Sequence, residues 1–204
     1  MRTKSVLILP LFFYFTAFSQ TKLEFGDVIA DTNFSSSGKQ VYLASNESKF
    51  WKVQNILQSK NELEIRFYSA SLPHPIYTLV ILTYDGGFWN AQKFTYENSG
   101  PFSISNATTI RMNYGEQKIF DYSFNQIFDT LKQNNIFLLP DQKDLNAKSA
   151  HAHDGGFFSI SFKAGEKFRQ YSFSNPDVYA VENPDIRAFT QFLRIIQTMN
   201  SILH

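Results

Sequence analysis

A series of short strand-like runs, separated by glycine-containing turns, dominates this sequence. Residues 62–69 alternate apolar and polar side chains, as the strand of a half-buried sheet does, whereas residues 76–84 are apolar on both faces and predict a central strand. An Asp-Gly-Gly sequence at residues 85–87 separates this run from the next, at residues 88–96. Because Asp-Gly supplies the positive φ angles of a tight hairpin turn, these runs are expected to pair antiparallel.

Further strand-like runs follow along the chain. Residues 157–162 alternate large apolar with polar side chains, and a glycine turn leads from them into a run at residues 167–173. Residues 108–114 and 117–122 form another candidate hairpin. Contiguous hairpins predict an α+β fold built on an antiparallel sheet, and they argue against a doubly wound parallel one.

Three segments have helical periodicity and predict helices that cover this sheet. The first, residues 46–60, places its apolar side chains on one face. The second starts with a capping box at Ser123 and Gln126 and then repeats apolar residues at i, i+3, i+4 and i+7. The third begins at Asn183-Pro184-Asp185 and runs to about residue 203, with an apolar arc broad enough to lie across a sheet. Its apolar residues are Ile186, Phe189, Phe192, Leu193, Ile195, Ile196 and Met199.

The tetrapeptide Asp-Gly-Gly-Phe occurs twice, starting at Asp85 and at Asp154. The first copy lies between two strand-like runs and is interpreted as a hairpin turn. The second follows a polar stretch and is expected to end a long loop where the chain enters a strand at Phe157. Duplication of a longer unit is the alternative, but the spacing from the preceding helix differs between the copies, so the repeat supports no functional conclusion.

The N-terminal residues have the pattern of a secretory signal. Arg2 and Lys4 precede an apolar stretch that ends at Phe18, and small residues stand where a signal peptidase reads the chain. The stretch is interrupted by a proline and is shorter than the roughly 20 apolar residues that a membrane-spanning helix needs. We therefore expect residues 1–19 to be cleaved after Ser19, leaving a secreted or periplasmic protein that is not embedded in the membrane.

Residues 20–204 then form the mature chain. Removing 19 of the 204 residues leaves 185, a length that suits a single α+β domain. Two modules that share a core, residues 20–120 and 121–204, are the alternative. The chain has 22 Phe residues against ten Tyr and two Trp. Phe has no polar group and gains most from complete burial, so we interpret this excess as core.

The charge balance argues against nucleic acid as a partner. The chain has 19 basic and 18 acidic residues, and loss of Arg2 and Lys4 would change its formal charge from +1 to −1. The basic residues are scattered, so the sequence predicts no surface that would follow a phosphate backbone. The absence of cysteine excludes disulfides, thiolate nucleophiles and cysteine-based zinc sites.

A cluster of His151, His153 and Asp154 is the candidate metal site. Alternate residues of an extended segment point to the same side, so the two imidazoles can share one ion, with Asp154 beside them. Two imidazoles do not complete a site, and a third donor, such as His74 or an acid, would have to come from elsewhere. A lone H-x-H in a polar loop is more often solvated surface, and we expect neither a metal nor another cofactor.

Other catalytic patterns are missing from the sequence. It contains no G-x-S-x-G, no H-E-x-x-H and no phosphate-binding glycine loop. Glu62 and Glu64 alternate on the polar face of a predicted strand, and we interpret them as solvated side chains, not as an acid/base pair.

The sequence therefore favours a soluble exported protein that binds an envelope protein or a glycan without catalysing a reaction. One alternative is a metal-assisted hydrolase that uses the loop of His151 and His153. Another is a carbohydrate-binding module in which Tyr77, Trp89 and Tyr96 form an exposed strip. The last alternative ranks lowest, because Phe dominates the aromatic residues and lacks the polar group that sugar-binding surfaces use.

Overall fold

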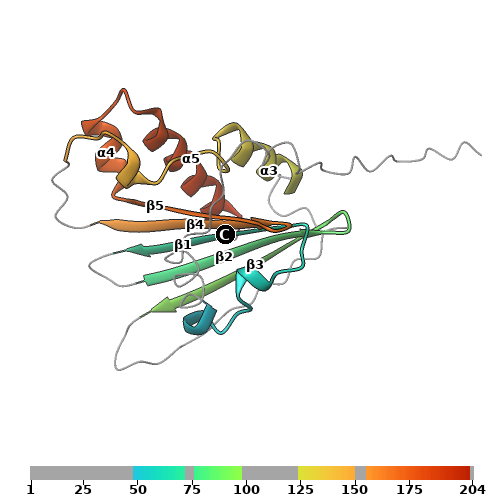
Figure 1. The fold of residues 1–204 in the computed structure, drawn as a ribbon. Helices are drawn as coiled ribbons and strands as arrows, with labels where there is room; N and C mark the ends of the chain where they lie inside the picture. Colours follow the sequence, from blue (N-terminus) through green and yellow to red (C-terminus); the bar gives the residue numbers. More distant parts are fainter. Residues whose placement is uncertain (1–47, 72–75, 98–123, 150–154, 203–204) are drawn as a thin grey trace, which may run out of the picture.

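The computed structural model describes residues 48–71, 76–97, 124–149 and 155–202, and Figure 1 shows its fold. Five strands form one antiparallel sheet in the order β3-β2-β1-β4-β5. The strands are β1 (Leu63–Ser71), β2 (Ile76–Asp85), β3 (Phe88–Glu97), β4 (Gly156–Ala164) and β5 (Lys167–Ser174). The helices are the 3-10 helices η1 (Ile56–Gln58) and η2 (Gln142–Asp144) and the α-helices α3 (Phe124–Gln133), α4 (Pro176–Glu182) and α5 (Arg187–Ser201).

The predicted α+β class, with an antiparallel sheet of consecutive hairpins and a C-terminal helix, is confirmed. Within the described ranges, no helix is both long enough and apolar enough to cross a membrane. The signal-like residues 1–19 and the candidate hairpin of residues 108–122 lie outside the described residues.

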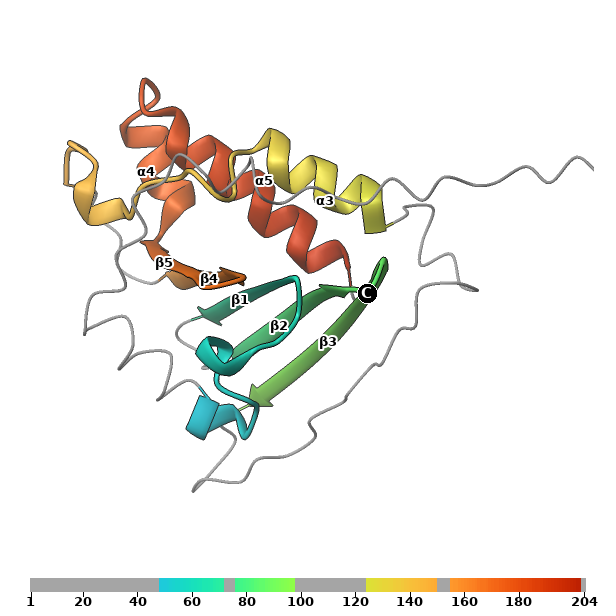
Figure 2. The same ribbon diagram turned by 45° about the vertical axis from the view of Figure 1, so that its right-hand side comes forward.

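The two faces of the sheet are covered by different parts of the chain. Helices α3, α4 and α5 lie together on one face, which we call the helical face (Figures 1 and 2). The segment of residues 48–61, which contains η1, lies on the opposite face, called the second face here. Side chains of β1 alternate between the two: Leu63 and Ile65 join the helical core, whereas Glu64 and Arg66 belong to the second face.

The first Asp-Gly-Gly sequence forms the predicted hairpin turn, and of the second copy the structure describes Gly155 and Gly156. Gly86 and Gly87 have φ angles of 56° and 87° and form the two-residue turn between β2 and β3, where positive φ is required. The second copy leads into β4, which begins at Gly156. The carboxamide of Asn175 lies where a Cβ of residue 155 would stand, so a larger residue than Gly155 would require that side chain to move.

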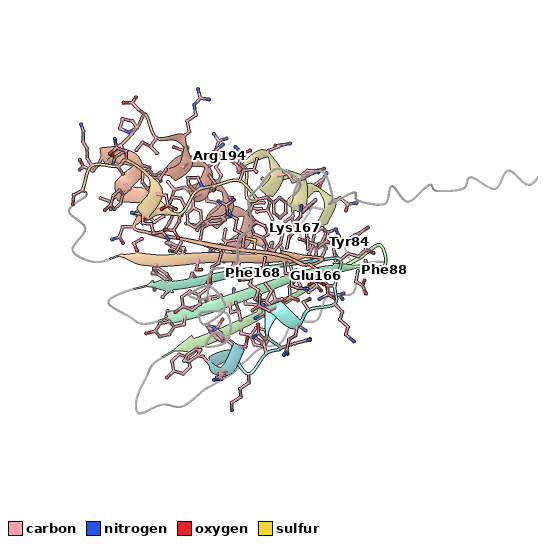
Figure 3. The ribbon with its side chains drawn as sticks, in the orientation of Figure 1. Tyr84, Phe88, Glu166, Lys167, Phe168 and Arg194 are labelled. Atoms are coloured by element: carbon pink, nitrogen blue, oxygen red, sulfur yellow. The ribbon has the colours of Figure 1, made fainter. Side chains whose placement is uncertain are left out.

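Phe side chains fill the space between the sheet and the helices, as the sequence interpretation expected (Figure 3). Phe173 of β5 stacks on Phe192 of α5 with ring centroids 4.1 Å apart, and Phe137 meets Phe162 of β4 edge to face at 4.9 Å. An exception is Phe88, at the tip of the β2–β3 hairpin, which is 52% exposed.

Helix α3 has the predicted amphipathic pattern. It buries Phe124, Ile127, Phe128 and Leu131, the four residues at the i, i+3, i+4 and i+7 positions. Asn135, with a φ angle of 57°, gives the helix a left-handed exit. The apolar periodicity was sufficient to predict this helix, because its apolar stripe packs on the apolar face of the sheet.

The continuous helix predicted over residues 46–60 is wrong. In the described part of this range, only residues 48–51 are α-helical, Lys52 has a φ angle of 54°, and extended backbone leads into the short helix η1. The side chain of Asn55 accepts a hydrogen bond from the backbone N–H of Leu57 at 3.0 Å, which offers this backbone an alternative to helical pairing. As a result Ile56 is buried, whereas Phe50 is 49% exposed.

The predicted start of the C-terminal helix at Asn183 is also wrong. Asn183 ends α4, since its N–H donates to the carbonyl of Tyr179 at 2.9 Å, and α5 begins only at Arg187. Helix α4 was missed, although Pro176 stands in its first turn as Pro184 was expected to stand in the next helix. The broad apolar arc of α5 is confirmed: it buries Phe189, Phe192, Ile195, Ile196 and Met199.

The chain that follows α3 lies against β5. The hydroxyl of Tyr171 donates to the carbonyl of Ile136 at 2.6 Å, and Arg169 donates to the carbonyls of Phe137 and Leu139. Burial raises the pKa of Tyr171 far above its ordinary value and lowers the pKa of Arg169. This stretch is thereby fixed to the edge strand by side-chain contacts from β5.

Candidate functional site

A polar pocket of about 280 Å³ lies on the second face of the sheet, between the strands β1 to β3 and the segment that precedes β1. Strands supply its floor and the chain around Gln54 supplies part of its wall. Its volume is slightly below the range for small-molecule sites, which starts at about 300 Å³. The lining residues are Val53, Gln54, Asn61, Glu64, Arg66, Ile81, Thr83, Asn90 and Gln92.

Strand register arranges the floor of the pocket as two rows across three strands. Alternate residues of a strand point to the same face, so the paired positions of β1, β2 and β3 line up on the second face. The first row is Glu64, Thr83 and Asn90, and the second row is Arg66, Ile81 and Gln92. The floor of the pocket therefore combines a carboxylate, a guanidinium, a hydroxyl and two carboxamides within a small area.

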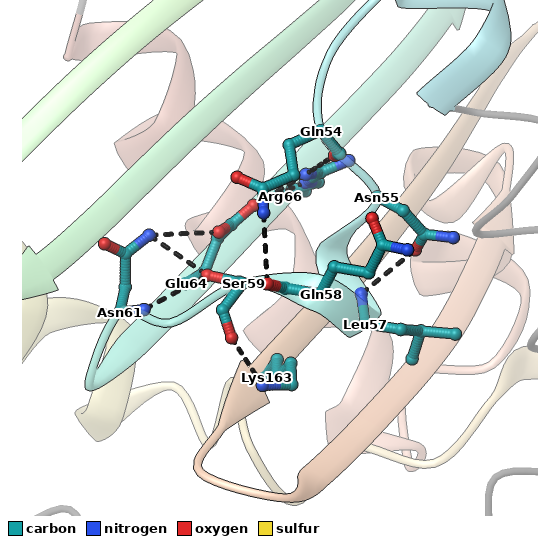
Figure 4. A network of polar contacts seen from close by, with 9 residues as sticks. All are labelled: Gln54, Asn55, Leu57, Gln58, Ser59, Asn61, Glu64, Arg66 and Lys163. Carbon is teal, nitrogen blue, oxygen red and sulfur yellow. Dashed lines mark hydrogen bonds and ion pairs between the residues drawn. The ribbon is translucent and has the colours of Figure 1, made fainter.

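Glu64 and Arg66 form an ion pair that is almost fully removed from water (Figure 4). The Oε1 atom of Glu64 lies 2.8 Å from Nε and 2.7 Å from Nη2 of Arg66, and Oε2 accepts a hydrogen bond from Asn61. Arg66 Nη2 also donates to the carbonyl of Gln54 at 2.5 Å. The interpretation of Glu64 as a solvated side chain is therefore wrong, because the segment before β1 covers this part of the face.

A second set of contacts ties the covering segment to the sheet. Lys163 of β4 donates from Nζ to the carbonyl of Ser59 at 2.7 Å, and this lysine is buried. Ser59 Oγ in turn accepts hydrogen bonds from the backbone N–H and the Nδ2 of Asn61, at 3.3 and 3.0 Å. Together with the contact between Arg66 and Gln54, these bonds hold the wall of the pocket in one position (Figure 4).

Asn90 and Gln92 present polar groups that the described structure does not use. Both side chains are half-buried on β3, and neither has a hydrogen-bond partner within the described ranges. The NH₂ group of a carboxamide donates hydrogen bonds and its oxygen accepts them. Each of these two side chains can therefore bind either a donor or an acceptor group of a ligand. Neither residue was predicted from the sequence to belong to a site. The available signal was their alternation with the apolar residues Trp89 and Ala91, which identifies a polar strand face but not a pocket.

An aromatic cluster adjoins the pocket on the same face. Trp51 lies 6.4 Å from Tyr68 and 6.3 Å from Phe94, measured between ring centroids. Tyr68 and Phe94 follow Arg66 and Gln92 by two residues on their strands, so the cluster begins directly beside the second row of the pocket. Four of its seven rings carry a polar atom. The members of the cluster are Phe50, Trp51, Tyr68, Tyr77, Phe94, Tyr96 and Phe157.

The predicted exposed strip of Tyr77, Trp89 and Tyr96 does not exist in that form. Tyr77 and Tyr96 are cross-strand partners on the second face, with centroids 5.7 Å apart, but Tyr96 is buried. Trp89 is 1% exposed and packs on the helical face against Phe124 and Phe128. Trp89 and Tyr96 lie seven positions apart on one strand, and because this offset is odd their side chains point to opposite faces of the sheet.

The candidate metal ligands His151, His153 and Asp154, and the possible third donor His74, lie outside the described residues. In the ranges that are described, no group of three or more His, Cys, Asp or Glu side chains is placed to hold an ion. The metal site on the loop before β4 therefore stays a sequence-based hypothesis.

Comparison with known proteins adds no assignment. No protein-family model, curated protein or solved structure matches this chain.

Proposed function

We propose that this chain is a non-catalytic, exported binding protein that holds a small polar ligand, or the polar end of a larger envelope component, in the pocket on its second face. The observation that carries the proposal is the pair of carboxamides at Asn90 and Gln92, which point into a preformed pocket and have no partner in the described part of the chain. Export is supported by the basic and then apolar pattern of residues 1–19.

The hydrogen bonding of Glu64 favours a binding role for the pocket over acid/base catalysis. A general acid or base must exchange a proton with a bound substrate at hydrogen-bond distance. Both carboxylate oxygens of Glu64 already accept hydrogen bonds, from Arg66 and from Asn61. Such a carboxylate holds the neighbouring side chains in place, and the ligand is left to the uncharged groups of β3.

A thermal-shift screen of polar metabolites against the mature protein tests this function. Because a ligand that binds only the folded state raises the melting temperature, a compound bound in the pocket should stabilise the wild type and lose most of that effect in the Asn90→Ala, Gln92→Ala double variant. Gln197→Ala is the matched control, since it removes a carboxamide from the exposed side of α5. A screen in which every stabilising compound acts equally on the double variant would contradict the proposal.

Its export component has a separate test. The N-terminal sequence of the protein recovered from its native host should begin at Gln20. An intact Met1 terminus in the membrane fraction would contradict export as a cleaved protein.

A further inference from the structure

The charges in the pocket cancel, which restricts the class of ligand. Glu64 and Arg66 are the charged side chains of the pocket lining, and they are bound to each other at 2.7 Å. A charged ligand would have to give up its hydration to enter a site that has no net charge of the opposite sign. The pocket therefore suits a neutral ligand that is rich in hydrogen-bonding groups.

The unpartnered groups of β3 suit a ligand with several hydroxyls. Asn90 and Gln92 stand two residues apart on one strand face, which places their backbones about 7 Å from each other. Each carboxamide can both donate to and accept from a hydroxyl, and Thr83 adds a further hydroxyl in the first row. One six-membered sugar ring, with hydroxyls around its edge, spans such a set of groups.

The aromatic cluster supplies the other half of a sugar site. Tyr and Trp combine an apolar ring with a polar atom, and such side chains are suited to ligands that have both apolar faces and hydroxyls. On the helical face Phe prevails, whereas Trp51, Tyr68, Tyr77 and Tyr96 give the second face rings that are mostly polar-tipped. This division between the faces removes the argument from overall Phe content that ranked a glycan last.

We infer that the pocket binds a neutral saccharide unit, with Asn90 and Gln92 bonding its hydroxyls and the rings around Trp51 contacting the sugar that follows. The inference rests on the proposed function of the pocket and specifies its ligand. The pocket volume of about 280 Å³ limits the bound portion to one sugar ring, so a longer chain would continue over the aromatic cluster. Phe50 and Phe157, which are 49% and 42% exposed, offer further apolar surface there.

Titration calorimetry of the mature protein with defined sugars tests the inference. The probes are glucose, galactose, N-acetylglucosamine and their β-1,4-linked dimers where these exist, with glucuronate as the charged counterpart of glucose. We expect at least one neutral sugar to bind, its dimer to bind more tightly than the monomer, and glucuronate to bind more weakly than glucose. Emission from Trp51 should change on binding, whereas Trp89, buried on the helical face, supplies a constant background.

Variants locate the site. Because one hydrogen bond contributes about 0.5–1.5 kcal/mol, Asn90→Ala and Gln92→Ala should each weaken sugar binding by about two- to tenfold, while Gln197→Ala leaves it unchanged. Neither β3 side chain has a partner in the described structure, so both variants should fold as the wild type does, which circular dichroism checks.

The possible failures are distinguishable. If no sugar binds, but another polar compound binds in a way that depends on Asn90 and Gln92, the saccharide inference is wrong and the proposed function stands. A short uncharged peptide amide is the compound of choice for that comparison, since it also pairs with carboxamides. If glucuronate binds as tightly as glucose, the argument from cancelled charge is wrong. If sugar binding is unaffected by both β3 variants, the site has been placed wrongly.

Discussion

Glu64 and Arg66 lie two residues apart on one strand, and their contribution to stability depends on whether they are exposed to water or covered. On a solvated strand face such a pair contributes little, because water screens it. Here the segment of residues 53–61 covers the pair, so both charges are desolvated and depend on each other and on the contacts to Asn61 and Gln54. The ion pair therefore holds the residues around the pocket in place.

Removing one partner of this pair should therefore destabilise the protein strongly. Glu64→Gln or Arg66→Met alone should lower the free energy of unfolding by about 3–5 kcal/mol, because each leaves a buried charge without its counterion. The Glu64→Leu, Arg66→Met double variant should recover much of the loss. Urea denaturation measures all three. The control is Asp129→Asn, which breaks an exposed pair with Lys132 and should cost less than about 1 kcal/mol; single variants no worse than this control would refute the prediction.

Tyr171 gives a pH dependence whose sign follows from its burial. Burial holds the pKa of Tyr171 above the ordinary value of about 10, so above pH 10 the unfolded chain loses a proton that the folded chain keeps. The stabilising contribution is complete below pH 10 and is lost as the pH rises toward the folded pKa. Relative to Tyr171→Phe, the wild type should lose about 1.4 kcal/mol of unfolding free energy per pH unit above 10. Denaturation curves at pH 9 to 11 measure the difference, and parallel pH profiles would contradict the prediction.

At the scale of elements, two segments with similar apolar periodicity have different structures. Helix α3 was predicted correctly because its apolar stripe covers one sheet face and its end has a residue suited to left-handed backbone, Asn135. Residues 46–60 have a comparable stripe, yet Lys52 and Asn55 interrupt the helix, and the chain uses its backbone to bind Arg66. Apolar periodicity does not show which backbone carbonyls a buried charged side chain will bind. Those contacts depend on how the sheet is assembled.

Buried side chains of helix α5 should contribute more to the free energy of unfolding than exposed side chains of the neighbouring helix α4. Phe192 is fully buried, stacks on Phe173 and meets Tyr171 and Phe158 edge to face. Phe192→Ala should lower the free energy of unfolding by about 3–5 kcal/mol, through lost burial and the cavity that remains. Val181→Ala on α4 is the control, because Val181 is 79% exposed and should have an effect within about 0.5 kcal/mol. Chemical denaturation compares them, and a cost below 1 kcal/mol for Phe192→Ala would show that α5 is peripheral.

For the whole molecule, the class of fold followed from the order of strand-like runs, whereas the pocket did not follow from any local pattern. Asn90 and Gln92 come together with Glu64 and Arg66 only through the register of three strands. Which face receives the helices, and which is covered by residues 48–61, is a tertiary property that the alternation of β1 leaves open. The sequence shows how many aromatic residues the chain has, but only the paired strands show which of them lie on each face of the sheet.

The single domain of residues 20–204 and the two modules 20–120 and 121–204 predict different unfolding behaviour. Strand β1 pairs with both β2 and β4, and Trp89 of β3 packs against Phe124 and Phe128 of α3, so each stretch depends on the other for part of its core. Unfolding should therefore be one cooperative transition.

Two signals report on the two stretches separately. Both tryptophans, Trp51 and Trp89, lie in residues 20–120, whereas α3, α4 and α5 all lie in residues 121–204. Tryptophan fluorescence and the helical circular dichroism signal should then share one urea midpoint and one slope. Tyr84→Phe, which keeps the ring beside Trp89 on the same strand pair, should shift the two curves together if it shifts them at all. Midpoints that separate, with fluorescence changing while the helical signal is retained, would show that the chain unfolds as two modules.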